Sequence, residues 1–488
     1  MPLTIGLNID DPSVSSSGGA AVGSKITSDL ASPDVAGEYM TQADIRAEQP
    51  KAMPAQDKLG FARARMRATG QWDASQFMGR RWPIGCVALE ITQRCNLDCT
   101  ACYLSEHAEA VKDIPLEELF LRIDMIFEHY GPGTGVQVTG GDPTLRKQDE
   151  LIEIVRRISA KGMRPALFTN GIRAKRELLK KLADVGLVDV AFHVDMTQER
   201  RGFDSEAALN AIRQDYIERA RGLPIAVMFN TTVIDRTIDQ IPDVVDFFVK
   251  NSDVVRLASF QLQADTGRGT LGRRGDGITM KSLQRQIETG AGTSISFDTS
   301  HIGHSHCNRY AMTFVANGHA YDALDDVGLF QAVLEGTARR SFDRRNKASV
   351  VRSFLKGIVA RPSLWSGVIA WIARKLWRAK FDIIASRGRV NKLSFFIHNF
   401  MDACSLEKER IDGCSFMVAT QSGPISMCLH NAKRDAFVLA PVRMKKPGGD
   451  QFWDPLTGQI KDNDQSPSRP AMPPRRVRRS VRIIEAAK

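Results

Sequence analysis

The chain has 488 residues, 43% of them hydrophobic, which is enough for one large domain with appended segments. Its 8 cysteines are too few for a disulfide scaffold, and no apolar run of about 18 residues predicts a membrane-spanning helix. The first 25 residues lack the basic and apolar regions of a secretory signal, so we expect a reducing, cytoplasmic location. The formal net charge of +11 is unevenly distributed along the chain.

Residues 1–55 are rich in Ser, Gly, Ala and Asp without periodicity, which predicts a disordered N-terminal segment. Residues 58–80 look like a basic helix leading into the core. From Trp82 onward, strand and helix patterns alternate, which is typical of a parallel sheet. We expect strands at 86–91, 136–138, 165–168, 188–194, 225–229 and 254–263, and helices at 115–130, 151–160, 174–185, 205–221 and 241–250. Six such units predict an α/β fold, an open (β/α)6 partial barrel of the TIM type over residues 82–290.

Three cysteines, Cys95, Cys99 and Cys102, directly follow the first predicted strand in the spacing C-x3-C-x2-C. They sit on the loop at the carboxyl end of that strand, where barrel enzymes keep their chemistry. Three thiolates can hold three irons of a 4Fe–4S cluster and leave the fourth iron open. The alternatives are a chance cysteine cluster or half of a zinc knuckle, although no fourth zinc ligand is obvious nearby.

Polar or glycine-rich stretches also follow the next strands. Strand two ends in Gly140-Gly141-Asp142-Pro143-Thr144, and strand three ends in Thr169-Asn170-Gly171. Glycines permit close backbone approach to a ligand, although a Gly-Gly-Asp-Pro stretch standing alone is more often a simple turn. The residues that end strands four and five, His193, Asp195 and Asn230, are equally compatible with cap or turn roles.

Taken together, the cysteine spacing and the Gly-Gly-Asp-Pro-Thr stretch resemble the radical S-adenosylmethionine (SAM) superfamily. The resemblance implies that the open iron of a 4Fe–4S cluster is chelated by the amino and carboxylate groups of SAM. One electron, from a donor such as flavodoxin or ferredoxin, then cleaves SAM to methionine and a 5′-deoxyadenosyl radical. That radical abstracts hydrogen from an unactivated C–H bond of the substrate.

The resemblance also implies roles for individual positions. Cys95, Cys99 and Cys102 would ligate the cluster, and Gly140, Gly141 and Asp142 would border SAM, with Asp142 replacing the family's usual, longer Glu. Thr169 and Asn170 fit the pattern after strand three, and His193, Asp195 and Asn230 lie where the family contacts the ribose and carboxylate of SAM. The family's aromatic residue before the third cysteine is Ala101 here, so Tyr103, just after it, becomes the candidate for adenine contact. This arrangement resembles a subgroup that includes archaeal tetraether-lipid synthases.

Five cysteines lie outside this motif. Cys86 is expected to be a buried apolar residue within strand one. Cys404, Cys414 and Cys428 lie in a turn-rich segment that resembles the C-terminal cysteine region of the same subgroup. We predict an auxiliary iron–sulfur cluster there with Cys307 as the fourth ligand, free buried thiols and a zinc site being the alternatives. The histidines flanking Cys307 are further candidate ligands: His301, His304 and His306.

Residues 291–440 are expected to form an α-rich, cysteine-containing extension with basic amphipathic helices. Residues 339–389 carry fourteen Lys or Arg and two Asp, a local balance of +12. Within them, Trp365, Ile369, Ile372 and Leu376 recur at helical spacing beside Trp371 and Trp377. Basic, amphipathic, Trp-bearing helices are typical of contact with an anionic membrane surface. The alternative is a helix packed on the barrel with a solvated basic face. No RNA-binding motif accompanies the charge, which disfavours nucleic acid, and the basic tail at 441–488 is expected to be disordered.

The sequence therefore predicts a radical SAM enzyme acting on a lipid or other long-chain molecule, peripherally at the inner face of the membrane. A peptide- or protein-modifying radical SAM enzyme with an auxiliary cluster is the second hypothesis. A non-catalytic iron–sulfur or zinc module that tethers a partner at the membrane is the third.

Overall fold

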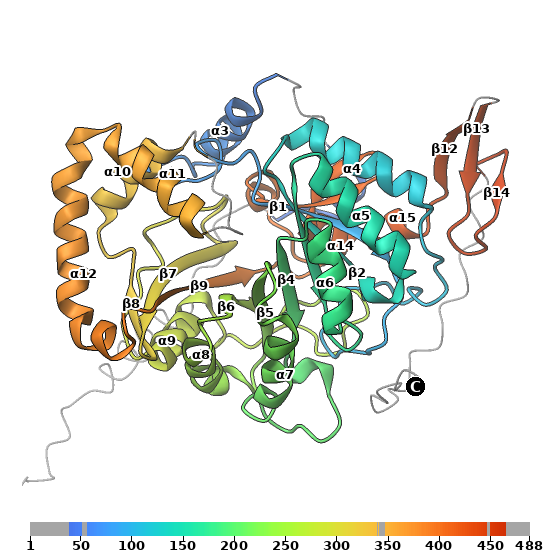
Figure 1. Cartoon of the computed structure of the whole chain (residues 1–488). Helices are drawn as coiled ribbons and strands as arrows, with labels where there is room; N and C mark the ends of the chain where they lie inside the picture. The colour runs from blue at the N-terminus through green and yellow to red at the C-terminus, as the bar shows by residue number, and fades with distance from the viewer. Residues whose placement is uncertain (1–38, 51–55, 339, 341–346, 447–448, 465–488) are drawn as a thin grey trace, which may run out of the picture.

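The structure is a computed structural model that describes residues 39–50, 56–338, 340, 347–446 and 449–464. Within these residues the largest element is a curved 11-stranded sheet in the order β11-β10-β1-β2-β3-β4-β5-β6-β9-β7-β8 (Figure 1). Its strands are β1 Cys86–Thr92, β2 Gly135–Gly140, β3 Arg164–Thr169, β4 Asp189–His193, β5 Ala226–Val233, β6 Val255–Leu262, β7 Asn308–Ala316, β8 His319–Asp322, β9 Val390–Asn399, β10 Phe416–Thr420 and β11 Gly423–Ser426.

The run from β10 through β1 to β6 and on to β9 is parallel throughout, and β11 and the β7–β8 hairpin flank it antiparallel. Strands β1 to β6 lie where the sequence predicts them, and the α/β partial-barrel prediction is confirmed. The structure adds to it, because β9 and β10 extend the parallel sheet from residues that we predicted as an α-rich extension. The C-terminal part of the chain therefore completes the sheet on both sides.

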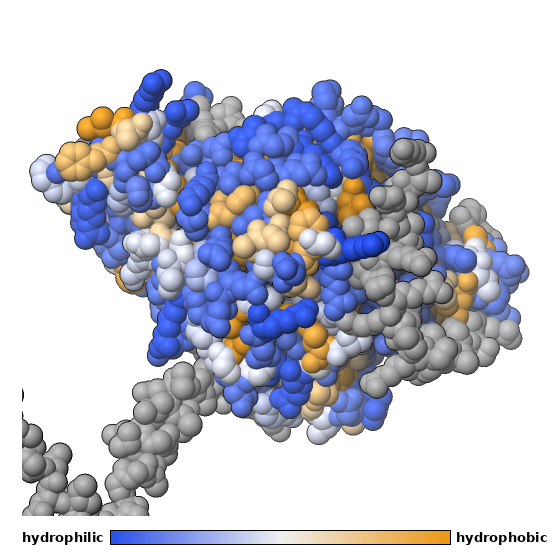
Figure 2. Space-filling model, turned by 90° about the horizontal axis from the view of Figure 1, so that it is seen from below, coloured by the Kyte–Doolittle hydropathy of each residue, from blue (hydrophilic) through white to orange (hydrophobic). Residues whose placement is uncertain are grey.

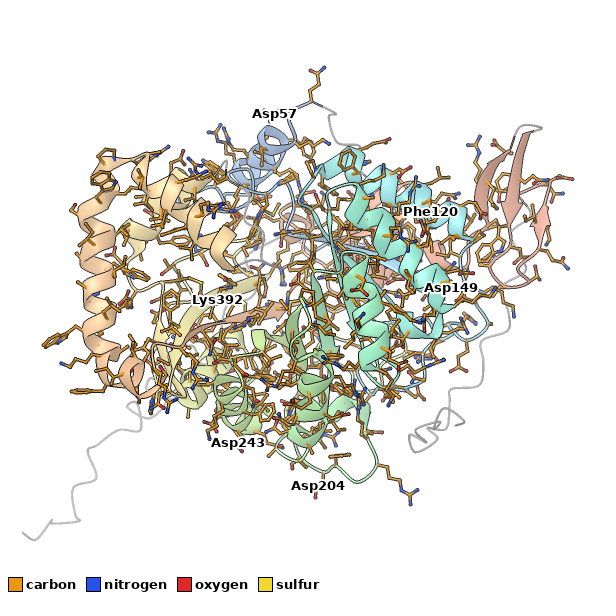
Figure 3. The ribbon with its side chains drawn as sticks, viewed as in Figure 1. Asp57, Phe120, Asp149, Asp204, Asp243 and Lys392 are labelled. Carbon is orange, nitrogen blue, oxygen red and sulfur yellow. The ribbon has the colours of Figure 1, made fainter. Side chains whose placement is uncertain are left out.

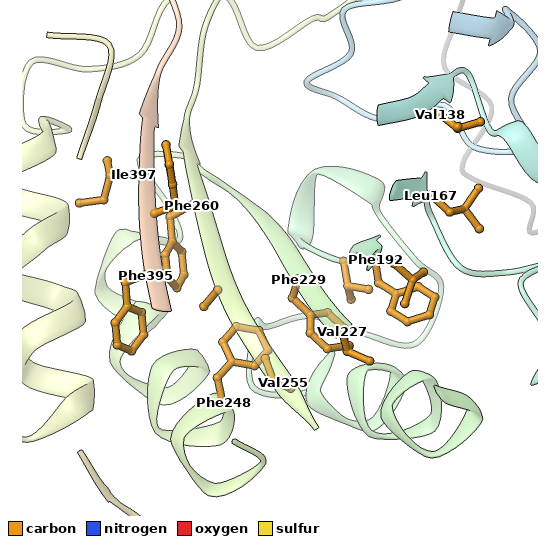
Figure 4. Packing of buried hydrophobic residues seen from close by; sticks show 14 of the residues in the cluster. Val138, Leu167, Phe192, Val227, Phe229, Phe248, Val255, Phe260, Phe395 and Ile397 are labelled. Atoms are coloured by element: carbon orange, nitrogen blue, oxygen red, sulfur yellow. The ribbon is translucent and has the colours of Figure 1, made fainter. Parts of the chain in front are cut away.

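Amphipathic helices cover the outer face of this sheet: α4 Leu116–Tyr130, α5 Gln148–Ala160, α6 Arg176–Asp184, α7 Asn210–Ala220, α8 Ile241–Lys250 and α9 Met280–Ala291. Helix α8 shows the pattern, since Ile241, Val244, Val245 and Phe248 recur at helical spacing and are all buried. Figure 4 shows this layer, in which Phe248 stacks on Phe229 of β5 with ring centroids 5.2 Å apart. Large side chains thus fill the space between the strands and the helices.

The inner face of the barrel mixes small side chains with larger ones such as Phe168 and Met228. Ala88, Ala166, Ala191, Ser259 and Ser394 line its interior, one from each of five strands. A closed TIM barrel fills this position with bulky branched residues. Here the small residues leave a cavity of about 1870 Å³ that runs through the barrel. The small side chains on the inner face thus contribute to this cavity.

In the described part of the chain no backbone ladder joins β9 and β10, so the sheet stays an open partial barrel. Instead, the Phe416 ring at the start of β10 packs against Phe396 and His398 of β9, with centroids 6.0 and 4.9 Å apart. His398 also stacks on Phe396 and Phe400 at 4.2 and 5.6 Å. We call this aromatic contact between β9 and β10 the seam.

Three short segments differ from the sequence predictions. Residues 39–50, predicted as disordered, contain the capped helix α2 (Gln42–Ala47), and its Ile45 packs in a small core with Met401 and Leu429. The basic helix predicted over 58–80 is α3 (Lys58–Ala68), and it ends before Gly70, whose φ of 65° helices do not adopt. Part of the predicted disordered tail forms a separate sheet of β12 (Val442–Lys446), β13 (Gly449–Trp453) and β14 (Ile460–Lys461), which packs on Ile114. Residues 1–38, 51–55 and 465–488 lie outside the described residues.

Three helices form a layer at one end of the molecule: α10 Val327–Thr337, α11 Lys347–Val359 and α12 Trp365–Ala385 (Figure 1). The inner side of this layer contacts the sheet, since Trp371 of α12 packs edge-on against Phe314 of β7 at 5.8 Å. Its outer side exposes a row of large apolar residues that includes Trp377, Phe381 and Ile384, at 71, 76 and 73%. No helix among the described residues is both long and apolar enough to cross a bilayer. Three short helices complete the C-terminal part: α13 (Lys408–Asp412), α14 (Met427–Ala432), which contacts β10 and β11, and α15 (Arg434–Val438), which contacts α14.

Candidate functional site

The structure places Cys95, Cys99 and Cys102 together at the carboxyl end of β1, where all three line the barrel cavity. Burial, followed by the charge of Asp142, raises the pKa of Cys95 to about 12. Burial and the nearby thiols of Cys102 and Cys95 also raise the pKa of Cys99. Burial therefore opposes ionisation of Cys95 and Cys99, and a strongly positive centre such as a metal would favour their thiolate forms.

The donor set at this loop consists of three thiols, which is the ligand type of iron–sulfur clusters. No three His, Cys, Asp or Glu side chains in the described ranges converge as the ligands of one metal ion would. Cluster thiolates bind separate irons, so their sulfurs are spread more widely than the four ligands of one zinc. The loop that carries them is fixed at Thr100, whose amide donates to Thr197 O at 2.8 Å.

The Gly140–Gly141 pair is required by the packing of this loop. Gly140 has a φ of 127°, and a Cβ there would lie 2.0 Å from Thr92 O. A Cβ on Gly141 would lie 2.0 Å from Arg94 O. Both glycines line the cavity, so the backbone of β2 lies open to a ligand at the edge of the cysteine loop.

Asp142 is buried and does not line the cavity. Its Oδ1 accepts from Thr144 N and Oγ1 at 3.0 and 2.5 Å, and its Oδ2 accepts from Thr169 Oγ1 and Asn170 N, both at 2.8 Å. The side chain thus ties the turn after β2 to the end of β3. In this structure it positions Thr169 and Asn170, both of which do line the cavity.

The ends of β4 and β5 are joined in a similar way. Asp195 is fully buried and accepts from His193 Nε2 at 2.6 Å and from Thr232 N at 2.7 Å. Burial opposes its ionisation, but His193 and the hydrogen bonds outweigh burial and lower the pKa of Asp195 to about 2. His193 and Asn230 line the cavity, whereas Asp195 lies behind them. Of the predicted SAM-contacting residues, Asp142 and Asp195 therefore occupy supporting positions.

Tyr103 lines the cavity but is held firmly in place. Its hydroxyl donates to Gly140 O at 2.7 Å, and the Arg434 guanidinium lies 4.6 Å from its ring centroid. Arg434 in turn donates to both oxygens of Glu90 at 2.9 Å, and all three residues line the cavity. Burial raises the pKa of Glu90, but Arg434 dominates and lowers it to about 2. Sequence reasoning missed Glu90 and Arg434, which are 344 positions apart.

A second residue missed from the sequence is Arg268, on the segment after β6. Its side chain is 4% exposed, and its Nε donates to Cys102 Sγ at 3.3 Å. The backbone of the same segment pairs with the cysteine loop, through Arg268 N to Leu104 O and Thr270 N to Thr100 O, both 2.8 Å. This segment covers the cysteine loop and buries a positive charge beside it.

The cavity extends away from the cysteine loop towards the α10–α12 layer. At that far end it is lined by Phe330, Val333, Phe354, Val368 and Trp371. Lys392, labelled in Figure 3, lies on β9 at the wall of this far part. His398 lines the cavity too, and burial lowers its pKa to about 3, so its imidazole is neutral. One continuous space thus joins the three thiols to the underside of α12.

The remaining cysteines divide into two groups. Cys414 is close enough to raise the pKa of Cys86, Cys307 and Cys428, each of which is raised first by burial. These thiols lie beside the seam, and Arg410, 4% exposed, donates to Cys307 Sγ at 3.4 Å. Cys404 is exposed, and the thiols that affect the other cysteines do not include it. The structure thus brings Cys307, Cys414 and Cys428 together, with Cys86 rather than Cys404 beside them.

Of the histidines flanking Cys307, His301 and His304 have polar partners, whereas the buried Nδ1 of His306 has no hydrogen-bond partner among the described residues. His301 pairs with Asp73 at 2.5 Å, and His304 lies 3.5 Å from Glu409 and packs edge-on against His306. Burial and the neighbouring His306 lower the pKa of His304 to about 4.

Comparison with known proteins identifies the central part of the chain. Residues 89–248 match the model of the Radical SAM superfamily. The chain is 28% identical over 186 residues to 7,8-dihydro-6-hydroxymethylpterin dimethyltransferase of Methanocaldococcus jannaschii, covering 37% of the chain and 36% of that protein. It is also 28% identical over 179 residues to PqqA peptide cyclase of Bradyrhizobium diazoefficiens, covering 36% of the chain and 46% of that protein. The chain thus matches less than half the length of these relatives.

Among solved structures, native anSMEcpe with bound AdoMet overlaps 41% of the chain and 58% of its own, at 16% identity and a TM-score of 0.32. Residues 89–248 form a radical SAM domain, of a family of enzymes that use SAM and a 4Fe–4S cluster. The tetraether-lipid subgroup stays a prediction.

Proposed function

We propose that this chain, which carries a radical SAM domain, cleaves SAM reductively and takes hydrogen from a long-chain hydrophobic substrate held in its hollow barrel. The observation that supports this most strongly is the cavity of about 1870 Å³, with three thiols near one end and apolar helices at the other. Ordinary ligand pockets measure roughly 300–1000 Å³, so there is room for SAM and a substrate together.

The proposed roles divide between the cofactors and the protein. When bound, the cluster and SAM supply one-electron cleavage to methionine and a 5′-deoxyadenosyl radical, with the electron coming from a donor such as flavodoxin or ferredoxin. Cys95, Cys99 and Cys102 would hold the cluster. The open backbone at Gly140 and Gly141 would receive the amino group of SAM. Thr169, Asn170, His193 and Asn230 would border the rest of SAM, with Asp142 and Asp195 orienting them and Tyr103 bordering the adenine.

The lining of the cavity supports a long apolar substrate. Phe330, Val333, Phe354, Val368 and Trp371 present hydrocarbon surface, and the small residues on the inner strands leave space for a chain. Burial of apolar surface would supply the binding free energy, about 0.8 kcal/mol per CH₂. Alkyl C–H bonds are unactivated, and breaking them calls for a radical.

The outer face of α12 supports a peripheral membrane location. Trp377, Phe381 and Ile384 are exposed beside the cations of Arg378 and Lys380. Figure 2 shows apolar and strongly hydrophilic side chains gathered side by side at this end of the molecule. Apolar insertion and attraction to anionic lipid act together on such a helix. Because Trp371 of the same helix lines the cavity, the membrane face and the substrate site lie on opposite sides of one helix.

The first test is anaerobic. The reconstituted protein would be assayed for iron, sulfide and dithionite-driven 5′-deoxyadenosine formation from SAM. We expect the intact chain to cleave SAM and Cys99→Ala to lose at least about 100-fold of that activity, since a missing ligand disrupts the cluster. Exposed Cys404 supplies the matched control, and Cys404→Ala should cleave SAM normally. An intact, reducible cluster without SAM cleavage would overturn the proposal in favour of a non-catalytic binding module.

The same samples test a second cluster at Cys307, Cys414 and Cys428. We propose this site because two buried thiols, Cys414 and Cys428, the half-buried thiol of Cys307 and a buried arginine meet there. About eight irons per chain are expected for the intact protein, and about four for Cys414→Ala. Retention of about eight irons in Cys404→Ala would show that Cys404 is not a ligand of the second cluster. A fall to about four irons in this variant would show that it is one. About four irons in the intact protein would rule out the second cluster.

A peptide- or protein-modifying enzyme is the second candidate function. The observation in its favour is the similarity to PqqA peptide cyclase. Lipid extracts and peptide pools incubated with the reduced enzyme and SAM would separate the two. Deoxyadenosine formation stimulated by the lipid extract supports the first proposal, and stimulation by the peptide pool alone supports the second.

A further inference from the structure

The guanidinium of Arg268 is buried without a close carboxylate. Its side chain is 4% exposed, yet its ion pairs with Asp98 and Glu109 measure 3.9 and 3.7 Å, beyond hydrogen-bond length. Its two hydrogen bonds go instead to Cys102 Sγ, at 3.3 Å from Nε, and to Leu97 O, at 3.2 Å from Nη2. Proteins rarely bury an arginine unless it is paired with negative charge. A thiolate or another anionic group at the Cys102 sulfur would supply that charge.

The segment that carries Arg268 is fitted closely to the cysteine loop. Gly267 has a φ of 55°, and a Cβ there would lie 2.4 Å from the carbonyl group of Tyr103. With the two backbone hydrogen bonds to Leu104 and Thr100, this contact fixes the path of residues 266–270. The direction of the Arg268 side chain is therefore set by backbone contacts on both sides.

The same arrangement recurs at the second group of thiols. Arg410 is also 4% exposed, and its Nε lies 3.4 Å from Cys307 Sγ while Nη2 donates to Asn399 O at 2.6 Å. In both places one guanidinium uses Nε for a cysteine sulfur and an Nη for a main-chain carbonyl. Arg410 additionally pairs with Glu407 at 2.9 Å, so the charge beside Cys102 is the less neutralised of the two.

We infer that Arg268 is a positioning residue for the cluster, one that donates an N–H to the Cys102 sulfur and raises the reduction potential of the site. This inference rests on the proposed function, because it assumes that Cys102 binds a cluster. Hydrogen bonds to the sulfurs and the net charge around a cluster are two of the quantities that set its potential. Both act in the same direction here, since the added electron is stabilised by a fixed positive charge and by an N–H donor.

The test is an EPR-monitored redox titration of the reconstituted protein without SAM. Arg268→Met removes the charge and the donor, and we expect at least a tenfold fall in the reduced fraction of cluster relative to oxidised at a fixed potential. For a one-electron couple, tenfold corresponds to about 59 mV. Arg268→Gln keeps an N–H donor without the charge. Its reduction potential should lie between those of the intact chain and Arg268→Met. Arg273→Met is the matched control, because Arg273 is 69% exposed and pairs with Asp402; its potential should be unchanged.

An unchanged potential in a fully loaded Arg268→Met protein would overturn the inference and leave the proposed function standing. A raised KM for SAM with an unchanged potential would also overturn it and would assign Arg268 to SAM binding. If Arg268→Met loads no cluster, Arg268→Gln takes its place in the test. A lowered potential in Arg268→Gln supports the inference, and an unchanged potential overturns it. If the intact chain loads no cluster at Cys95, Cys99 and Cys102, the proposed function and this inference fail together.

Discussion

Individual residues at the cysteine loop are tightly constrained by packing. Gly141 shows this, because the carbonyl oxygen of Arg94 occupies the position that a side chain would need. We predict that Gly141→Ala lowers the free energy of unfolding by about 3 kcal/mol, since the clash is with backbone and cannot be relieved by a rotamer change. Thermal and urea unfolding of the variant would measure the loss.

The matched control for this prediction is Gly277→Ala. Gly277 has nothing within 4 Å of its Cβ position and does not adopt a positive φ. Its stability should change by less than about 1 kcal/mol. Equal stability of Gly141→Ala and Gly277→Ala would show that the loop yields at Gly141 and would contradict the packing argument.

At this scale the sequence predicted the cysteine loop, several residues that line the cavity and two that support them, Asp142 and Asp195, but not the supporting arginines. Cys95, Cys99 and Cys102 lie within one stretch of eight residues, so their spacing alone brings them close together. Arg268 and Arg434 reach the same loop from segments 166 and 331 positions away from their partners Cys102 and Tyr103, and single arginines carry no periodic signal. Asp142 was predicted at the right place, while its contacts with Thr169 and Asn170 depend on tertiary structure.

At the scale of elements, α12 is unusual in being apolar on two sides. We predict that the triple variant Trp377→Ala, Phe381→Ala, Ile384→Ala binds anionic liposomes at least about tenfold more weakly than the intact chain. Burial of one such side chain contributes about 1.5–3 kcal/mol, and tenfold corresponds to about 1.4 kcal/mol. Sedimentation with phosphatidylserine-containing vesicles would measure this.

A control triple variant removes comparable side chains elsewhere: Leu121→Ala, Val327→Ala and Ile460→Ala. These residues are 54, 48 and 50% exposed but do not form one row on one helix. Their loss should leave vesicle binding unchanged. Equal binding by the α12 variant and the intact chain would show that the exposed apolar row of α12 is a solvated surface and not a membrane contact.

The sequence predicted β1 to β6 and the helices between them because strand patterns and helix patterns alternate along the chain at short, regular intervals. It did not predict that β9 and β10 join the same sheet. The residues of β9, from Val390 to Asn399, follow a helix-rich basic region, and nothing local indicates that they pair with β6, whose residues lie more than 120 positions earlier. Long-range pairing of this kind depends on the whole barrel and leaves no local pattern.

For the whole molecule, three histidines make stability depend on pH: His304 and His430 are buried and His398 is half-buried. Burial lowers the pKa of His398 and of His430 to about 3, and the pKa of His304 to about 4, against an ordinary value of 6.5. Below pH 6.5 the unfolded chain binds protons that the folded chain does not, so stability is full above that pH and falls as the pH drops. At pH 5.5 each histidine would cost about 1.4 kcal/mol.

We therefore predict a lower unfolding midpoint at pH 5.5 than at pH 7.5. Glu90 and Asp195, whose pKa values are lowered to about 2, keep their contribution down to about pH 4 and do not add to this difference. His398→Phe with His430→Phe should reduce the difference in midpoint. His319→Phe, at a side chain 67% exposed, should not. A midpoint equal at both pH values would show that these imidazoles gain protons without cost to the fold.

The pairing of β1 with β10 has a consequence for how the chain is made. One edge of β1 is covered by β2 early, but its other edge stays unpaired until Phe416 and the residues after it are synthesised, 324 positions after Thr92. At about 5–20 residues per second, that edge is open on the ribosome for roughly 15–65 s. An apolar strand with one free edge is a template for unwanted pairing. Yield in the cell should therefore depend on chaperone supply during translation, and a pause placed before residue 416 should lower it.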